Sequence, residues 1–403
     1  AGILDLATTG MSFDTATGNG GGAITVNTGA VLRISQAFNT GYSRAITING
    51  GTMHIGAIDT YSNNITLQNG AYISGTAPRL GFHSNATITV SGTSASFITS
   101  GLTMVKGSMT SATLDVADVT SSSATDLTVS GVIGDLSGYG GLRLVKSNSG
   151  TLLLSAANTF SGGVTVNGGV LRMGNKNALG AFATGRPVTQ VTVNSGAAID
   201  FNGIVDATYG YTIAGTGVGG TGALTNSGGA IGGGSAQTSN STLSNNASIG
   251  GTGDWALLTN SHGTTNLNLA GFTLTKTGTN TISLASTETT AGTIQVSAGK
   301  IEFGNAVGGT GVVGAATALV LDNTANAGLT VIRASSIGSL AGGGASGGNV
   351  NLNANTLTVG ALNTDTAYAG AISGTGGGLT KSGTGKLTLP CTNTYTGATT
   401  VNG

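Results

Sequence analysis

Acidic side chains are the first candidates for catalytic residues. Enzymes that cleave glycosidic bonds use two carboxyl groups about 5 to 9.5 Å apart. The densest acidic group in the chain is Asp115, Asp118 and Asp126, and Asp200 and Asp206 form a second pair. The other acids stand singly, and Asp115 falls in the outward phase of an alternating stretch. We therefore interpret both groups as solvated faces or turns, and we predict no catalytic residues.

Metal-binding and nucleophilic residues are equally dispersed. His54, His83 and His262 are far apart, and none lies near the single cysteine, Cys391. The sequence has no acidic calcium-binding loop. A G-x-G-x-x-G match at 215–222 lacks the following helix and acidic residue that a dinucleotide site needs. Serine is so common that a Ser-His-Asp set has no predictive force, so we predict neither a metal site nor a cofactor.

Aromatic residues are the remaining candidates, since an exposed ring can stack on a sugar. Tyr209 and Tyr211 are two positions apart, so both rings point to one face of a strand. An exposed pair would suit glycan binding, but we favour a role in the core or in coil stacking. Cys391 cannot form an internal disulfide. It is either a small turn or core residue or an intermolecular bridge.

The composition limits the class of protein that could position these residues. The chain has 403 residues with 73 glycines, 3 prolines and only 7% charged residues. Fourteen basic residues balance fourteen acidic ones, so nothing indicates nucleic-acid binding. Apolar residues make up 38%, too many for disorder, and no stretch approaches the roughly 18 apolar residues of a membrane helix. Because the first residues lack a signal peptide pattern, we expect a processed or excised segment.

Strand-like alternation occurs throughout the chain. Two examples are "AITVNTGAVLRIS" at 23–35 and "NITLQNGAYISG" at 64–75, where apolar residues recur at every second position between Asn-Gly or Thr-Gly pairs. Such turns fit antiparallel hairpins. They also fit the corners of a parallel solenoid, where glycine and asparagine accept positive φ.

An internal repeat favours the solenoid. Alignment on Lys146, Lys276 and Lys381 brings apolar pairs into register at fixed distances. In the first copy these pairs are Leu152/Leu154, Val164/Val166 and Leu171/Met173, and in the second they are Ile282/Leu284, Ile294/Val296 and Ile301/Phe303. Each repeat thus contains three short strands, and each strand has two apolar side chains that point inward. Three such strands make one coil, whose open faces must be buried by neighbouring coils. We therefore expect all six residues of the first copy to be buried in parallel strands.

The repeat resembles the passenger-associated strand repeat of bacterial autotransporters. The segments "NTFSGGVTVNGGVLRM" at 158–173 and "NTYTGATTVNG" at 393–403 carry the motif, and "TIQVSAGKIEF" at 293–303 is a degenerate copy. The resemblance implies a right-handed parallel β-helix exported to the cell surface or beyond it. It implies no particular activity, because such passengers include adhesins, proteases and inert stalks. We expect the passenger part alone, since the ten-residue alternating segments of a translocator barrel are missing.

The sequence thus predicts an all-β protein, a single right-handed parallel β-helix over residues 1–403, without evident capping domains. About 20 residues a coil would give about twenty coils. Our main functional hypothesis is a non-enzymatic subunit of an extracellular or bacterial surface filament. The alternative is an autotransporter-type adhesin that binds glycans or surfaces. We expect no nucleic-acid partner.

The filament hypothesis rests on the two ends of the chain. Residues 2–6 align with 169–173, the third strand that the last repeat lacks. Joining one end to the other would complete that repeat, and open strand edges recruit other chains. The predicted head-to-tail interface of this homopolymer comprises Gly2, Ile3, Leu4, Leu6, Thr399, Val401, Asn402 and Gly403.

Overall fold

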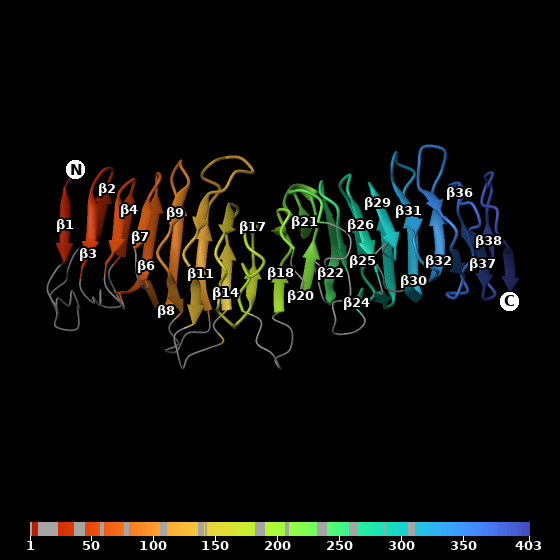
Figure 1. Ribbon diagram of the computed structural model, residues 1–403, viewed down its shortest axis with the longest axis horizontal. Coiled ribbons are helices and arrows are strands. Elements are labelled where there is room, and N and C mark those ends of the chain that lie inside the picture. Colours follow the sequence, from red (N-terminus) through yellow and green to blue (C-terminus); the bar gives the residue numbers. More distant parts are fainter. Residues whose placement is uncertain are drawn as a thin grey trace. The chain divides into compact units, whose positions relative to one another are not determined.

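A computed structural model describes residues 2–6, 23–35, 45–56, 60–75, 80–104, 111–135, 141, 143–181, 190–205, 209–231, 240–257, 265–285, 287–304 and 311–403. Two of the sequence candidates, Asp206 and His262, lie outside these residues, and the side chain of His83 is not described. Contacts group the chain into two compact units, residues 1–191 and 192–403. Each unit is described by itself (Figure 1).

The first unit consists of short strands separated by turns. Its strands are β1 (Ile3–Leu6), β2 (Ile24–Asn27), β3 (Val31–Ile34), β4 (Ala45–Asn49), β5 (Thr52–Ile55), β6 (Thr60–Gln68), β7 (Tyr72–Gly75), β8 (Leu80–Ser91), β9 (Ser96–Ile98), β10 (Leu102–Met104), β11 (Ser111–Val116), β12 (Leu127–Val129), β13 (Ile133–Asp135), β14 (Arg143–Ser147), β15 (Thr151–Leu154), β16 (Val164–Val166) and β17 (Gly169–Met173). At the unit boundary lies β18 (Gln190–Val193).

These strands stack in three parallel rows. One row runs β1, β3, β5, β7, β9, β12, β15, β17. A second runs β2, β4, β6, β8, β11, β14, β16. The long strands β6 and β8 also begin a third row with β10 and β13. Each strand therefore pairs with the strand one coil before it and one coil after it, which is the arrangement of a solenoid.

The second unit repeats this construction. Its strands are β19 (Ala197–Asp200), β20 (Gly210–Gly215), β21 (Leu224–Asn226), β22 (Ser241–Gly251), β23 (Trp255–Leu257), β24 (Thr265–Asn268), β25 (Thr273–Lys276), β26 (Thr281–Leu284), β27 (Thr287–Thr289), β28 (Gly292–Val296), β29 (Lys300–Phe303), β30 (Val313–Leu321), β31 (Gly328–Val331), β32 (Ser335–Gly342), β33 (Asn349–Asn351), β34 (Thr356–Val359), β35 (Thr366–Ala367), β36 (Ile372–Ser373), β37 (Gly378–Ser382), β38 (Leu387–Thr388) and β39 (Thr399–Asn402). Among the described residues, a 3-10 turn, η2 (Val218–Gly220), lies between β20 and β21.

Three rows are again present in the second unit. One runs β19, β21, β22, β25, β28, β30, β32. Another runs β20, β22, β24, β27, β30, β32, β34, β37, β39. The third runs β23, β26, β29, β31, β33, β36. The strand pairings of the described residues are parallel, so the hairpin alternative is wrong and the all-β parallel solenoid is confirmed.

The core consists of ladders of inward side chains. Leu127, Leu152 and Leu171 lie in register on β12, β15 and β17, and all three are fully buried. The six residues expected in the core, Leu152, Leu154, Val164, Val166, Leu171 and Met173, have 0% exposure. This part of the prediction is therefore confirmed, whereas the right-handed sense of the coil stays a prediction.

The coils are longer and more variable than expected. The side chains of Ser283 and Glu302 are hydrogen-bonded across one coil and are 19 positions apart in sequence, whereas those of Asp115 and Ser147 are 32 positions apart. Since many coils exceed 20 residues, the chain makes fewer turns than the twenty expected. Some of the extra residues lie within the long strands, where the register shifts in the β6–β8, β20–β22 and β30–β32 pairs.

Candidate functional site

The most distinctive side chain in the first unit is a lysine in the core row. Lys146 on β14 is fully buried and in register with Leu114 and Val166, both inward residues. Its ammonium donates hydrogen bonds to the carbonyl oxygens of Ser147 and Asn148, at 2.9 and 2.8 Å. A third bond, of 3.0 Å, goes to the oxygen of Gly168 on the next coil. The lysine thus joins two successive turns, and we call this arrangement a lysine clamp.

The same clamp recurs in the second unit. Lys276 is fully buried and donates to the oxygens of Thr277, Gly278 and Ala298, at 2.6, 3.0 and 3.1 Å. Lys381 donates to the oxygens of Ser382 and Gly383. In all three repeats the two acceptors nearest in sequence follow the lysine directly. The lysines that aligned the repeats are therefore themselves structural elements of the turn.

Burial changes the electrostatics of these lysines. Desolvation lowers the pKa of Lys146 from 10.5 to about 8, against the opposing influence of Asp115 and Asp126. Desolvation lowers the pKa of Lys276 to about 8 as well, and Asp254 opposes it. Three carbonyl oxygens are suited to an ammonium group, which has three donors and no acceptor. Lys146 and Lys276 are therefore held through backbone oxygens, and within the described residues neither forms a direct ion pair.

Aspartates complete the turns from the preceding coil. Asp126 is fully buried and accepts hydrogen bonds from the backbone N–H groups of Val119, Thr120 and Thr151, at 2.9, 2.9 and 2.7 Å. In the other two repeats, Asp254 accepts from the N–H of Thr281, and Asp365 accepts from the N–H of Lys386, both at 2.7 Å. Each donor lies five positions after a clamp lysine. In each repeat, the lysine thus binds carbonyl oxygens of the turn, and the aspartate binds a backbone N–H group of the same turn.

An asparagine links neighbouring coils in two of the repeats. Asn158 is buried, accepts from the N–H of Ile133 at 2.8 Å and donates to the oxygen of Ala178 at 2.6 Å. Asn393 likewise accepts from the N–H of Ile372 at 2.9 Å. The Asn-Thr-aromatic part of the motif therefore satisfies backbone groups between strands, where no ladder partner is available.

Two of the described acidic candidates are engaged by backbone groups, and Asp206 lies outside the described residues. Asp126 and Asp200 are buried, so the solvated interpretation is wrong for both. Asp200 accepts from the backbone N–H groups of Asn202 and Ser227 and from the hydroxyl of Ser227. Asp118 is exposed and Asp115 is half-buried. Both buried carboxylates accept hydrogen bonds from the backbone of turns, in agreement with the turn alternative of the sequence interpretation.

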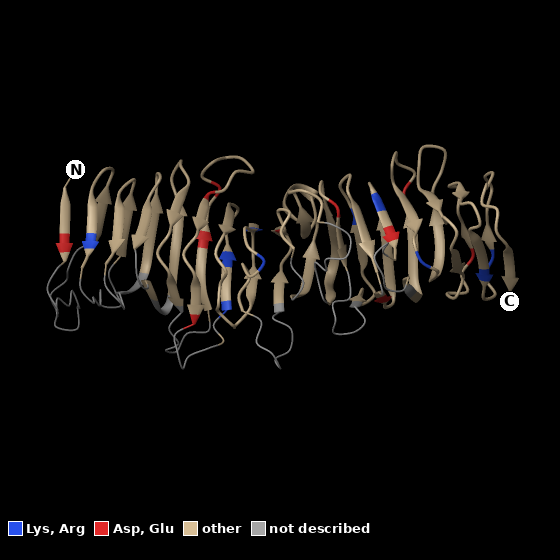
Figure 2. Cartoon of the chain, viewed as in Figure 1, with Lys and Arg blue, Asp and Glu red and all other residues tan. Residues whose placement is uncertain are grey.

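Charged residues are few and scattered along both units (Figure 2). His54 is half-buried, and its Nδ1 lies 3.0 Å from the hydroxyl of Ser74. Within the described residues, no group of three or more His, Cys, Asp or Glu side chains could hold a metal ion. Cys391 is exposed and free, and its thiol donates to the oxygen of Ala369.

The aromatic pair belongs to the core. Tyr209 and Tyr211 are each 1% exposed, so they offer no stacking surface for a sugar. Phe201 lies 6.1 Å from the ring of Tyr211 and 5.1 Å from that of Trp255, both edge to face. Trp255 donates its indole N–H to the oxygen of Gly250 at 2.9 Å. The core interpretation is confirmed, and the glycan interpretation of this pair is wrong.

The residues of the predicted assembly interface are mostly exposed. Ile3, Leu4 and Val401 are 61%, 57% and 70% exposed, whereas Leu6 is buried. Gly2, Thr399, Asn402 and Gly403 are exposed as well. Strand β1 lies in the same row as β17, in agreement with the alignment of residues 2–6 on 169–173. Head-to-tail assembly itself stays a prediction.

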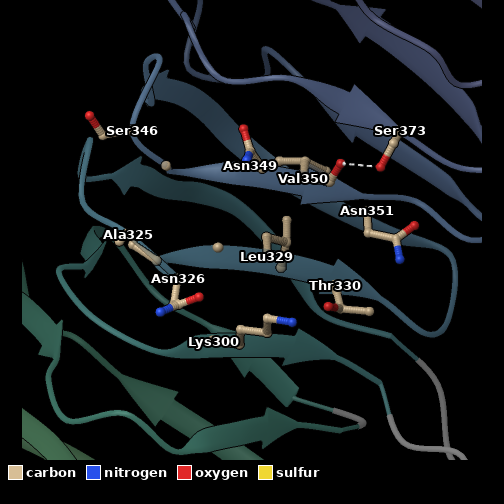
Figure 3. A pocket seen from close by; sticks show the side chains of 13 residues that line it. Lys300, Ala325, Asn326, Leu329, Thr330, Ser346, Asn349, Val350, Asn351 and Ser373 are labelled. Carbon is tan, nitrogen blue, oxygen red and sulfur yellow. Dashed lines mark hydrogen bonds between the residues drawn. The ribbon is translucent and has the colours of Figure 1, made fainter.

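A polar groove of about 420 Å³ lies in the second unit, over β29, β31, β33 and β36. Figure 3 shows the labelled side chains that line it, including Lys300, Thr330, Asn349 and Asn351. Gly328 stands in register between Lys300 and Asn349, so the middle strand contributes no side chain at that position. The sequence alone does not reveal this groove, because the groove depends on which residues of successive coils come into register.

Comparisons with known proteins agree with this architecture. Three segments, residues 144–173, 274–302 and 379–403, match the passenger-associated-transport-repeat. Each segment contains one of the three clamp lysines. The chain is therefore a parallel β-solenoid in which three segments are similar to the repeat of autotransporter passengers.

A curated relative extends this similarity. The Adhesin BmaC autotransporter of Brucella suis biovar 1 (strain 1330) is 39% identical over 133 residues, which is 32% of this chain and 4% of that protein. The chain thus spans about 4% of the length of this relative. No solved structure matches. The similarity to passengers implies a protein that is secreted or displayed on the cell surface. None of the helices in the described part of the chain is long and apolar enough to cross a membrane.

Proposed function

We propose that this chain is a segment of an adhesin passenger that attaches cells to glycans or to other surfaces. The observation that carries the proposal is the threefold passenger repeat, supported by the similarity to an adhesin autotransporter. In the adhesin role, the solenoid presents long rows of outward side chains, and the clamps hold the turns between those rows. The filament hypothesis receives no comparable support from the relatives, so attachment is the better interpretation.

We also propose that the chain is not an enzyme. The two buried aspartates, Asp126 and Asp200, accept hydrogen bonds from backbone N–H groups of turns, so their carboxylates are committed to the backbone. A glycosidase needs one carboxyl group that stays protonated and a second one facing it. The test is incubation with polysaccharides and measurement of new reducing ends, and sustained cleavage by the pure chain would contradict this proposal.

Attachment can be tested with fluorescent beads coated covalently with the purified chain. Under gentle flow, these beads should attach to an epithelial cell monolayer or to immobilised glycans in clear excess over control beads. The control beads carry the same chain after chemical unfolding, which keeps the composition and removes the folded surface. Equal attachment of both bead types on all surfaces would refute the proposed function.

A further inference from the structure

We propose that the polar groove over β29, β31, β33 and β36 binds sugar residues that carry an acidic group, a carboxylate or a sulfate. This inference deepens the proposed function and rests on it for the link to attachment. The groove is about 420 Å³, within the range of 300 to 1,000 Å³ that is usual for ligand sites. The charge of the groove, its hydrogen-bonding groups and its wall all suit such a ligand.

The charge of the groove comes from one residue. Of the 13 residues that line it, Lys300 alone is charged, and this side chain is exposed. Within the described part of the chain, no hydrogen bond or ion pair involves the ammonium group of Lys300. The nearest acid on the same strand, Glu302, accepts a hydrogen bond of 2.8 Å from Ser283 on the preceding coil. One carboxylate oxygen of Glu302 is thus engaged on the preceding coil, while Glu302 also stands in register with Thr330 of the groove. The ammonium group of Lys300 stays available to an anionic ligand.

Neutral polar side chains supply the rest of the lining. Thr330, Asn351 and Ser373 stand in register on successive strands, about 4.8 Å apart (Figure 3). No partner within the described residues engages the hydroxyl of Thr330. The amide oxygen of Asn349 accepts from the N–H of Ala371 at 3.0 Å, and its NH₂ group stays available. Hydroxyl and amide groups both donate and accept, as the many hydroxyls of a sugar require.

The wall of the groove is preorganised by the turns at one end of these strands. The side-chain oxygen of Asn323 accepts from the N–H groups of Ser346 and Gly347, at 2.8 and 3.2 Å. The hydroxyl of Thr324 donates to the oxygen of Ser297 at 2.6 Å. These bonds join the turns of three successive coils, so the wall needs little ordering when a ligand enters. A preformed wall reduces the entropic cost of binding, because fewer groups must become ordered.

A sugar fits this surface better than a peptide or a nucleic acid does. An extended peptide binds by adding a strand to an open sheet edge, but the backbones of β31 and β33 are already paired on both sides. A nucleic acid requires several cations for its phosphates, and this groove offers one. A short stretch of an anionic polysaccharide needs one cation among many hydrogen-bonding groups.

The test is calorimetric titration of the full chain with three probes. Tetragalacturonate carries carboxylates, its methyl ester is the neutral match, and a sulfated galactose oligosaccharide separates the two anion types. We expect one or both acidic probes to bind and the neutral ester to bind about fivefold or more weakly, as expected for loss of one exposed ion pair. Binding of neither acidic probe, or equal binding of the ester, would overturn the proposal.

Variants place the binding in the groove. Lys300→Gln should weaken binding of the acidic probe about fivefold, and Thr330→Val should weaken it about threefold through loss of one hydroxyl. Lys176→Gln, at an exposed lysine of the first unit, is the matched control and should leave binding unchanged. Because Lys300 and Lys176 are both exposed, neither change should shift the thermal transition. If Lys300→Gln binds like the unaltered chain, the groove is not the site.

The bead assay separates this inference from the proposed function. Beads with Lys300→Gln that attach as well as unaltered beads refute the groove while the adhesin function stands. Unaltered beads that fail to attach, although the acidic sugar binds in solution, refute the adhesin function while the groove stands.

Discussion

Replacing Lys146 with methionine tests the lysine clamp directly. Methionine keeps an unbranched apolar stem in the core row and removes only the ammonium group. The carbonyl oxygens of Ser147, Asn148 and Gly168 then lose their common donor. We expect the first unit to lose stability, because these oxygens belong to two successive turns that the clamp holds together.

The magnitude follows from two opposing effects. Hydrogen bonds from a charged donor contribute about 1.5 to 3 kcal/mol each, so three contribute on the order of 5 to 9 kcal/mol. Burial of the ammonium opposes them. The pKa of Lys146 lies at about 8 instead of 10.5, and a pKa unit equals about 1.4 kcal/mol, so the net cost of burying the charged form is about 3 to 4 kcal/mol. Water can reach the exposed turn at Asn148 and replace part of the loss. We expect Lys146→Met to lower the free energy of unfolding by about 2 to 4 kcal/mol.

Urea unfolding measures this loss, and hydrogen exchange of the amides of β14 and β16 locates it. Local measurement is needed because the stability of a solenoid accumulates coil by coil. Lys176→Met is the matched control, since Lys176 is exposed and the change should be nearly neutral. If Lys146→Met is as stable as the unaltered chain, or more stable, desolvation outweighs the carbonyl bonds and the clamp does not stabilise the fold.

Further predictions concern the same turns and core. The folded chain releases the proton of Lys146 at about pH 8, and the unfolded chain releases it near pH 10.5. As the pH rises between these values, the unaltered chain should therefore gain stability relative to Lys146→Met. Urea unfolding at several pH values measures this gain. Asp126→Asn should cost about 1 to 3 kcal/mol in the same assay, because an amide has one acceptor oxygen and its NH₂ group repels a backbone N–H donor; an unchanged midpoint would contradict the role of the carboxylate. Leu154→Ala should cost about 2 to 5 kcal/mol, since Leu154 is fully buried, and a loss below 1 kcal/mol would mean that the row collapses around it. A chelator should leave the thermal transition unchanged, and a lower transition temperature would reveal a metal site that the described residues do not contain.

Sequence patterns were sufficient for the architecture, because the rows of the core are a local property. Alternation with a period of two fixes which side chains of a strand point inward, whatever the length of the next turn. The apolar pairs at fixed distances from Lys146 and Lys276 then indicated coils that bury one another's faces. The role of the lysines was also within reach. Leu144 and Lys146, like Leu274 and Lys276, are two positions apart, so each lysine is in phase with the inward leucine.

The polar sites depended on contacts between coils, which the sequence does not encode in a local pattern. Asp126 belongs to an acidic cluster in the sequence, yet its three donors include Thr151, 25 residues later and one coil further on. The groove at Lys300 exists because Gly328 and Asn349 come into register on the following coils. Turn lengths vary so that one coil takes between 19 and 32 residues. The register between coils, and with it every contact from one turn to the next, is therefore decided by the packing of the whole solenoid, whereas the inward or outward direction of each side chain is decided by the strand alone.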